Sequence, residues 1–116
     1  MSDQPFPVKV LNDDCRLIHA GHVLDNSNAD TFSSMIMEMY SANIKFVLVD
    51  MSELEFLSSA GIGSILGTVE LFRERDGDII LTNVGSKVSH VLEVLDLFDY
   101  LTICRSNEEA TARCGI

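Results

Sequence analysis

One stretch in the middle of the chain, residues 44–75, constrains the fold more than any other. It reads IKFVLVDMSELEFLSSAGIGSILGTVELFRER. Its first half holds an unbroken apolar run, residues 46–49, that ends at Asp50. Such a run is typical of a strand that is covered on both faces. We therefore predict that this strand lies at the centre of a parallel sheet.

The second half of the stretch predicts an amphipathic helix. Apolar residues recur there at helical spacing, while charged residues point away from them; the apolar set is Ile62, Ile65, Leu66, Val69 and Phe72. Gly61 and Gly63 fall in the first turn, although glycine is a poor helix former. We expect these two glycines to permit a close backbone approach or a special turn before the helix.

Ser58 and Ser59 lie where the bend becomes the helix, and two interpretations of them stay open. A serine hydroxyl at this place can cap the helix by accepting a free N–H group. A helix N-terminus also tolerates a phosphate, because its N–H groups are unpaired and its dipole end is positive. In a parallel sheet, the corner beyond a strand's carboxyl end is also where ligands and partners meet the fold.

The rest of the chain extends this pattern into one α/β domain covering residues 1–116. Strands at 8–11 and 15–20 predict an amino-terminal hairpin, and residues 21–28 read as a loop rich in turn residues. The remaining elements are predicted as a helix at 29–40, strands at 79–81 and 100–104, a helix at 88–95 and a helical tail at 107–112. The order predicts a mixed, mostly parallel sheet with packed helices.

The charge balance excludes some partner classes. Asp and Glu number 18 against 8 Lys and Arg, which gives a formal net charge of -10. Such a charge opposes binding to nucleic acid and to anionic lipid. No apolar run approaches the roughly 18 residues that a membrane span needs, and the start MSDQPFPVKV does not read as a signal peptide. We expect a cytoplasmic protein without membrane insertion, as a monomer or weak dimer.

The cysteines and histidines do not predict a metal site. Cys15, Cys104 and Cys114 are odd in number and lack CxxC spacing, which favours reduced thiols over a disulfide framework. The first two fall in predicted strands and are expected in the core, whereas Cys114 is expected to be exposed. The three histidines are scattered and lack neighbouring ligands. We predict neither a metal nor a cofactor.

A phospho-aspartate receiver is one enzyme-like alternative, because acidic residues follow two predicted strands. However, the segment after Asp13 and Asp14 reads as a strand where a receiver needs a helix, and the last strand is followed by Arg105 where a receiver has lysine. We interpret Asp50 instead as a strand-end residue that pairs with backbone N–H groups near Ser52.

Hydrolase chemistry is not supported either. The run LSSAGIG lacks the glycine that a Gly-x-Ser-x-Gly nucleophile turn places two residues before its serine. A phosphate-binding Walker loop requires lysine, and this segment has none. We predict no catalytic residues and no enzyme activity.

The run VLVDMSELEFLSSAGIG, followed by an amphipathic helix, resembles the signature of STAS domains, the fold of bacterial anti-sigma factor antagonists. The segment GHVLDNSNA is similar to the Gly-x-Leu-Asp-x-x-x-Ala run that enters the first helix of that family. The resemblance covers nearly the whole chain. It implies a partner switch: the antagonist binds a serine-kinase anti-sigma factor, is released when the kinase phosphorylates it, and is reset by a serine phosphatase.

The resemblance also implies where the phosphate goes. The family's usual run, Asp-Ser-Ser-Gly or Asp-Ser-Ala-Gly, aligns with residues 58–61 of this chain. Ser58 stands in the place of the acid, and Ala60 stands before the glycine. The implied phosphoacceptor is therefore Ser59, with Ser58 as the alternative.

The family's partner-binding face is carried over in the same way. It implies a face made by the serine turn and the loop before the first helix, namely Asp25, Asn26, Ser58, Ser59, Gly61, Ile62 and Ser64. In some STAS proteins the domain is a docking subunit of a signalling scaffold or lipid transporter and is not phosphorylated. That alternative stays open.

Overall fold

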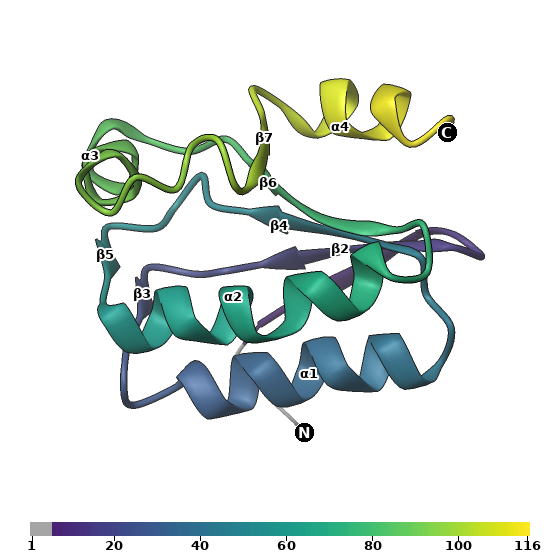
Figure 1. Cartoon of the computed structure of the whole chain (residues 1–116), viewed down its shortest axis with the longest axis horizontal. Coiled ribbons are helices and arrows are strands. Elements are labelled where there is room, and N and C mark those ends of the chain that lie inside the picture. Colours follow the sequence, from purple (N-terminus) through teal and green to yellow (C-terminus); the bar gives the residue numbers. More distant parts are fainter. Residues whose placement is uncertain (1–5) are drawn as a thin grey trace.

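The computed structural model describes residues 6–116, in which a twisted five-stranded sheet is covered by helices on both faces (Figure 1). The interpretation of the extreme amino terminus, residues 1–5, lies outside these described residues. The strands follow the order β1-β2-β4-β6-β7, with β1 antiparallel to β2 and every other neighbour parallel. Their bounds are Val8–Asn12, Cys15–His19, Phe46–Asp50, Asp78–Thr82 and Thr102–Cys104. The predicted hairpin and mostly parallel sheet are confirmed.

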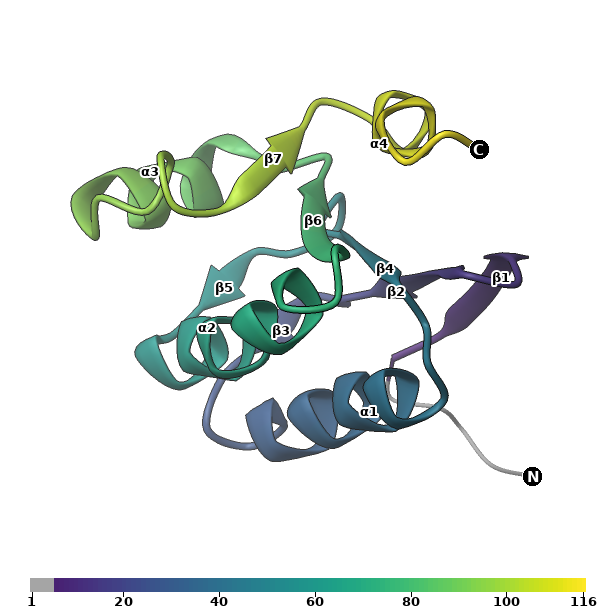
Figure 2. The same cartoon turned by 45° about the vertical axis from the view of Figure 1, so that its right-hand side comes forward.

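The helices divide unequally between the two faces of the sheet. α1 (Ala29–Ser41) and α2 (Ser59–Arg73) run side by side under one face, and the short α4 (Asn107–Arg113) lies over the other (Figures 1 and 2). α3 (Ser86–Val94) lies at one end of the sheet and packs against β5. The predicted tail helix is confirmed, whereas the last strand starts at Thr102 and not at Tyr100.

The position of β4 in the middle of the sheet explains why its sequence is apolar without alternation. Val47 and Val49 belong to the main core beneath α1 and α2, while Leu48 belongs to a smaller core on the α4 side. All three side chains have 0% exposed surface. Both faces of β4 are therefore buried, as an internal strand of a helix-covered sheet requires.

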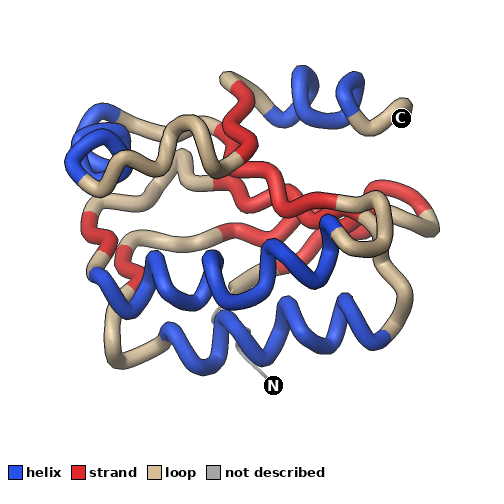
Figure 3. Tube along the Cα trace, in the orientation of Figure 1, coloured by secondary structure: helices blue, strands red, loops and turns tan. Residues whose placement is uncertain are grey.

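Two short strands were not predicted. β3 (Val23–Leu24) and β5 (Phe56–Leu57) pair in parallel and form a second, two-stranded sheet (Figure 3). β3 falls in the loop expected at residues 21–28, and β5 falls in the bend expected before the helix. These expectations were wrong because two residues are too few to show the alternation of a strand.

The burial of the cysteines agrees with the sequence-based predictions for two of the three. Cys15 and Cys104 are buried in the smaller core, as expected. Cys114 is half-buried and packs against the same core, so the prediction that it is exposed is wrong. α4 brings it there because the tail folds back over the sheet. Within residues 6–116, no helix combines the length and the apolar character that a membrane crossing requires.

Candidate functional site

The small β3–β5 sheet determines where the predicted site residues lie. Leu24 and Leu57 are cross-strand partners, and each is followed directly by a candidate residue, Asp25 and Ser58. The N–H of Ser58 donates to the carbonyl of Leu24 at 3.0 Å, which continues the pairing. The loop before α1 and the serine turn before α2 are thereby held against each other.

The two serines have different positions and roles. Ser58 is the N-cap residue of α2, with extended backbone angles, and its hydroxyl oxygen accepts the N–H of Gly61 at 3.3 Å. Ser59 is the first residue of the helix, and its side chain is exposed. The capping interpretation therefore holds for Ser58, whereas Ser59 presents its hydroxyl to solvent.

Gly61 and Gly63 also differ, although both were expected to permit either a close backbone approach or a special turn before the helix. A Cβ on Gly61 would collide with the backbone carbonyl of Leu24, so only glycine fits between α2 and β3. A Cβ on Gly63 would meet nothing within 4 Å, and the same is true of Gly67 one turn later. The expectation is confirmed for Gly61 and wrong for Gly63, which lies on the outer side of α2.

Asp25 is fixed by its own loop. Its carboxylate accepts the backbone N–H of Ser27 at 2.9 Å and the Ser27 hydroxyl at 2.6 Å. The side-chain hydrogen bond from Ser27 contributes most to holding the pKa of Asp25 below its usual value. Asn28 closes the loop, because its side chain bonds to the Asp25 N–H and to the Val23 carbonyl. Asp25 thus offers a fixed negative charge beside the serine turn.

A shallow hollow of about 360 Å³ lies between the starts of α1 and α2. It is lined by Asn26, Ala29, Asp30, Ser33, Ala60, Gly63 and Ser64. The Ser64 hydroxyl donates to the Gly61 carbonyl at 2.6 Å, so it serves the helix. Asn26 and Ser64, far apart in sequence, meet at this hollow. Sequence reasoning missed Gly63 as a lining residue, although it lies one helical turn from Ser59.

Part of the predicted binding face is buried. Asp25, Asn26, Ser58 and Ser59 reach the surface, and of the remaining three Ser64 is 8% exposed, Ile62 is 4% exposed and Gly61 is buried. Ile62 packs into the main core. These buried residues support the turn from beneath and offer a partner little side-chain area. We call the surface formed by Asp25, Asn26, Ser58, Ser59 and Gly63 the serine face.

The electrostatics around the serine face are one-sided. Neither residues 17–44 nor residues 46–72 contain a lysine or arginine. The same segments carry the exposed or half-exposed acids Asp25, Asp30, Glu53 and Glu55. The two segments that build the serine face are therefore acidic.

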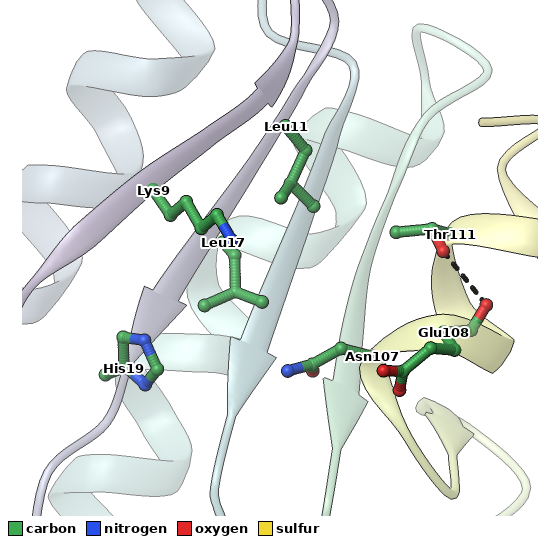
Figure 4. Close-up of a pocket in the computed structure, with 7 residues that line it drawn as sticks. All are labelled: Lys9, Leu11, Leu17, His19, Asn107, Glu108 and Thr111. Carbon is green, nitrogen blue, oxygen red and sulfur yellow. Dashed lines mark hydrogen bonds between the residues drawn. The ribbon is translucent and has the colours of Figure 1, made fainter.

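A second hollow, of about 290 Å³, lies on the opposite face of the sheet (Figure 4). It is lined by Lys9, Leu11, Leu17, His19, Asn107, Glu108 and Thr111, which come from β1, β2 and α4. None of the predicted site residues lines it. Near its rim the imidazole Nδ1 of His19 lies 3.8 Å from a carboxylate oxygen of Asp50. Within residues 6–116, no cluster of three or more His, Cys, Asp or Glu side chains is arranged to hold a metal ion.

Comparison with known proteins places the chain in a family. The family model of the STAS domain matches residues 6–110. A Bordetella bronchiseptica protein, "Putative anti-sigma factor antagonist BtrV", is 23% identical over 90 residues, which is 78% of each chain. The unphosphorylated form of the anti-sigma factor antagonist SpoIIAA has a TM-score of 0.83 at 22% identity, covering 96% of this chain and 97% of that one. The phosphorylated form of the Bacillus protein SpoIIAA has a TM-score of 0.74 at 20% identity, and the match covers 94% of this chain and 98% of that one. This chain belongs to the STAS domain family.

Proposed function

We propose that this protein is an anti-sigma factor antagonist that binds a serine-kinase anti-sigma factor and is released by phosphorylation of Ser59. The similarity to SpoIIAA and to the Bordetella protein supports the class of function. One observation in this chain carries the assignment of the site. It is the position of the exposed Ser59 in the first turn of α2, directly after Ser58, whose N–H is bonded to the Leu24 carbonyl just before the fixed Asp25.

Ser59 is the better acceptor of the two serines. Its side chain is exposed, whereas the Ser58 hydroxyl caps α2. A phosphate carries about -1.5 to -2 charges at neutral pH. At the helix N-terminus these charges meet free N–H groups and the positive dipole end, so the added group is compatible with the fold. SpoIIAA adopts a fold similar to this one in its phosphorylated form, which is consistent with that expectation.

Phosphorylation should break the complex for electrostatic reasons. The serine face has no lysine or arginine in the segments that build it, so a phosphate there would add to an existing negative field. A dianion enclosed in an interface without a partner cation costs several kcal/mol, and about 1.4 kcal/mol changes affinity tenfold.

The same proposal covers the remaining properties. The chain acts as a regulator in the cytoplasm, and a serine phosphatase restores Ser59. It carries no catalytic residue and no cofactor, inserts into no membrane and binds no nucleic acid, in keeping with its charge of -10. In isolation it is a monomer or a weak dimer.

Incubation with the cognate kinase and ATP, followed by peptide mass spectrometry, tests the proposal. We expect phosphate on Ser59, no phosphate on Ser59→Ala, and loss of most kinase binding by Ser59→Asp at an almost unchanged melting temperature. Gly67→Ala, at an exposed position on the same helix but away from the serine turn, is the control for phosphorylation and kinase binding, both of which should be unchanged. Phosphate on Ser58 would move the acceptor by one residue.

A docking subunit of a scaffold or transporter is the second candidate function. It is favoured by one departure from the family pattern, since Ser58 occupies the place of the usual acid and is engaged as a cap. In that case the kinase would phosphorylate neither serine. If the neighbouring genes encode transporter subunits and not a kinase and a phosphatase, that would also support the docking-subunit function.

A further inference from the structure

The end of α3 and the segment that follows it expose an unusual amount of apolar surface. Val94 is 68% exposed, Leu95 47%, Phe98 41% and Tyr100 39%. Four large side chains within seven residues therefore face solvent, although burying such side chains is normally favourable. We call the surface made by these four residues the α3-end surface. It shares no residue with the serine face.

This surface is held in a defined shape. At the end of α3 the N–H of Leu97 donates to the carbonyl of Leu92 at 2.9 Å, and the N–H of Asp96 donates to that of Glu93 at 3.0 Å. Asp96 has a left-handed backbone, with φ 58°, as a helix-ending residue of this type requires. Leu97, which lies between the exposed residues Leu95 and Phe98, and Leu101, which follows Tyr100, pack into the main core. The apolar side chains are thus presented by a closed turn.

A second tie fixes the far end of the surface. A guanidinium nitrogen of Arg73 donates to the Tyr100 carbonyl at 2.8 Å, and the guanidinium lies 5.0 Å from the centre of the Tyr100 ring. The Tyr100 hydroxyl donates to the carboxylate of Glu70. An open hollow of about 590 Å³ beside this tie is lined in part by Phe98 and Tyr100. The α3-end surface therefore borders a recess into which a partner side chain can fit.

The rim of the surface is acidic. Glu93, Asp96 and Asp99 are exposed and alternate with the four apolar residues. The nearby cation Arg73 is engaged, because it pairs with Asp78 at 3.0 Å and bonds to Tyr100. Lys87 and His90 lie earlier on α3, and Arg113 also lines the hollow. An apolar centre with carboxylates around it is complementary to apolar side chains flanked by lysine or arginine.

We propose that the α3-end surface is a docking site for a basic amphipathic segment of another protein, distinct from the serine face. A second copy of this chain is a poor occupant, since it has the same charge of -10 and the same acidic rim. Anionic lipid is disfavoured for the same reason. The partner binds with its apolar side chains on Val94, Leu95 and Phe98, and with its cations on the surrounding carboxylates.

An NMR titration of the ¹⁵N-labelled chain with a synthetic amphipathic helix of leucine and arginine tests this inference. We expect saturable shifts that concentrate in the amides of residues 93–100. Neither Val94 nor Leu95 belongs to the buried core, so the double variant Val94→Ser/Leu95→Ser should fold. It should bind the peptide at least about tenfold more weakly. Val10→Ser, at a 64% exposed valine on β1, is the matched control and should bind normally.

Charge is tested separately with the variant Glu93→Gln/Asp96→Asn/Asp99→Asn. Asparagine tolerates the left-handed backbone at position 96, so the turn is kept while three charges are removed. We expect weaker binding of the arginine peptide and no binding of a leucine and glutamate peptide. The inference is overturned if the shifts spread evenly over the acidic surface or if Val10→Ser weakens binding as much. It is also overturned if Val94 and Leu95 instead drive dimerisation in sedimentation, or binding to phosphatidylglycerol vesicles.

Discussion

The side-chain amide of Asn107 donates to a carboxylate oxygen of Asp50 at 3.0 Å, linking residues 57 positions apart in the chain. Asp50 ends the central strand β4 and is 7% exposed, while Asn107 begins α4. The other amide atom of Asn107, its oxygen, accepts the hydroxyl of Thr82 at 2.5 Å. The predicted bond from the Ser52 N–H to Asp50 is also present, at 2.9 Å. A polar tie thus fastens the last helix to the centre of the sheet.

Replacing Asn107 should remove these hydrogen bonds and destabilise the fold. Asn107→Ala leaves the buried Asp50 carboxylate and the Thr82 hydroxyl each short of one partner, which costs about 1–3 kcal/mol of unfolding free energy. Urea unfolding at neutral pH measures the change. Glu108→Ala, at an exposed neighbour on the same helix, should change stability far less. Equal midpoints for the wild type and Asn107→Ala would contradict the prediction.

The pH dependence of stability should report the same network. Burial raises the pKa of Asp50, but the hydrogen bonds from Asn107, Ser52 and Asn83 outweigh it and leave the pKa below its usual value. A lowered folded-state pKa contributes stability that is present above the unfolded value of about 3.9 and is lost as pH falls through the folded value. Because Asn107→Ala weakens this effect, its deficit should be largest at neutral pH and shrink below about pH 3. A deficit that grows on acidification would contradict this assignment.

Two glycines of α2 should respond to alanine with opposite signs. Gly61→Ala forces a Cβ against the Leu24 carbonyl, so it should destabilise the fold by about 1–3 kcal/mol. Gly67→Ala adds a Cβ in open space and should stabilise the fold by up to about 1 kcal/mol, because alanine is the better helix former. Thermal unfolding of the two variants, compared with the wild type, measures both shifts. Shifts of the same sign would mean that the Leu24 carbonyl moves away from a Cβ at position 61 at little cost.

Replacing Ser58 and replacing Ser59 should change the free energy of unfolding by different amounts. Ser58→Ala removes the cap on the Gly61 N–H and should cost about 0.5–1 kcal/mol, at the low end for a cap because the bond is 3.3 Å long. Ser59→Ala changes an exposed hydroxyl and should leave stability nearly unchanged. Ser58→Asp should restore the loss, since aspartate is also a good cap. Denaturant midpoints for the three variants test the assignment, and a larger loss for Ser59→Ala would reverse the two roles.

Much of the fold follows from local patterns. The apolar run that ends at Asp50, and the similar run before Thr82, predict buried parallel strands because the helix-covered sheet has no solvent face there. The apolar spacing from Ile62 to Phe72 predicts α2 because a helix repeats its inner face at that interval. The sequence of Ser58 and Gly61 likewise predicts a capped turn before the helix, because serine is a common N-cap and glycine is a poor helix former.

The sequence by itself therefore determined the elements that are long enough to repeat their pattern, together with the acidic balance and the serine-bearing turn. The tertiary structure alone decided which distant residues meet. The two-residue strands β3 and β5 hold Asp25 beside Ser58, and Asn107 reaches Asp50 from the last helix. The physical reason is that a pairing of two residues, or a single side-chain hydrogen bond, has no period along the chain. Its partner is chosen only when the whole sheet has brought the ends of its strands together.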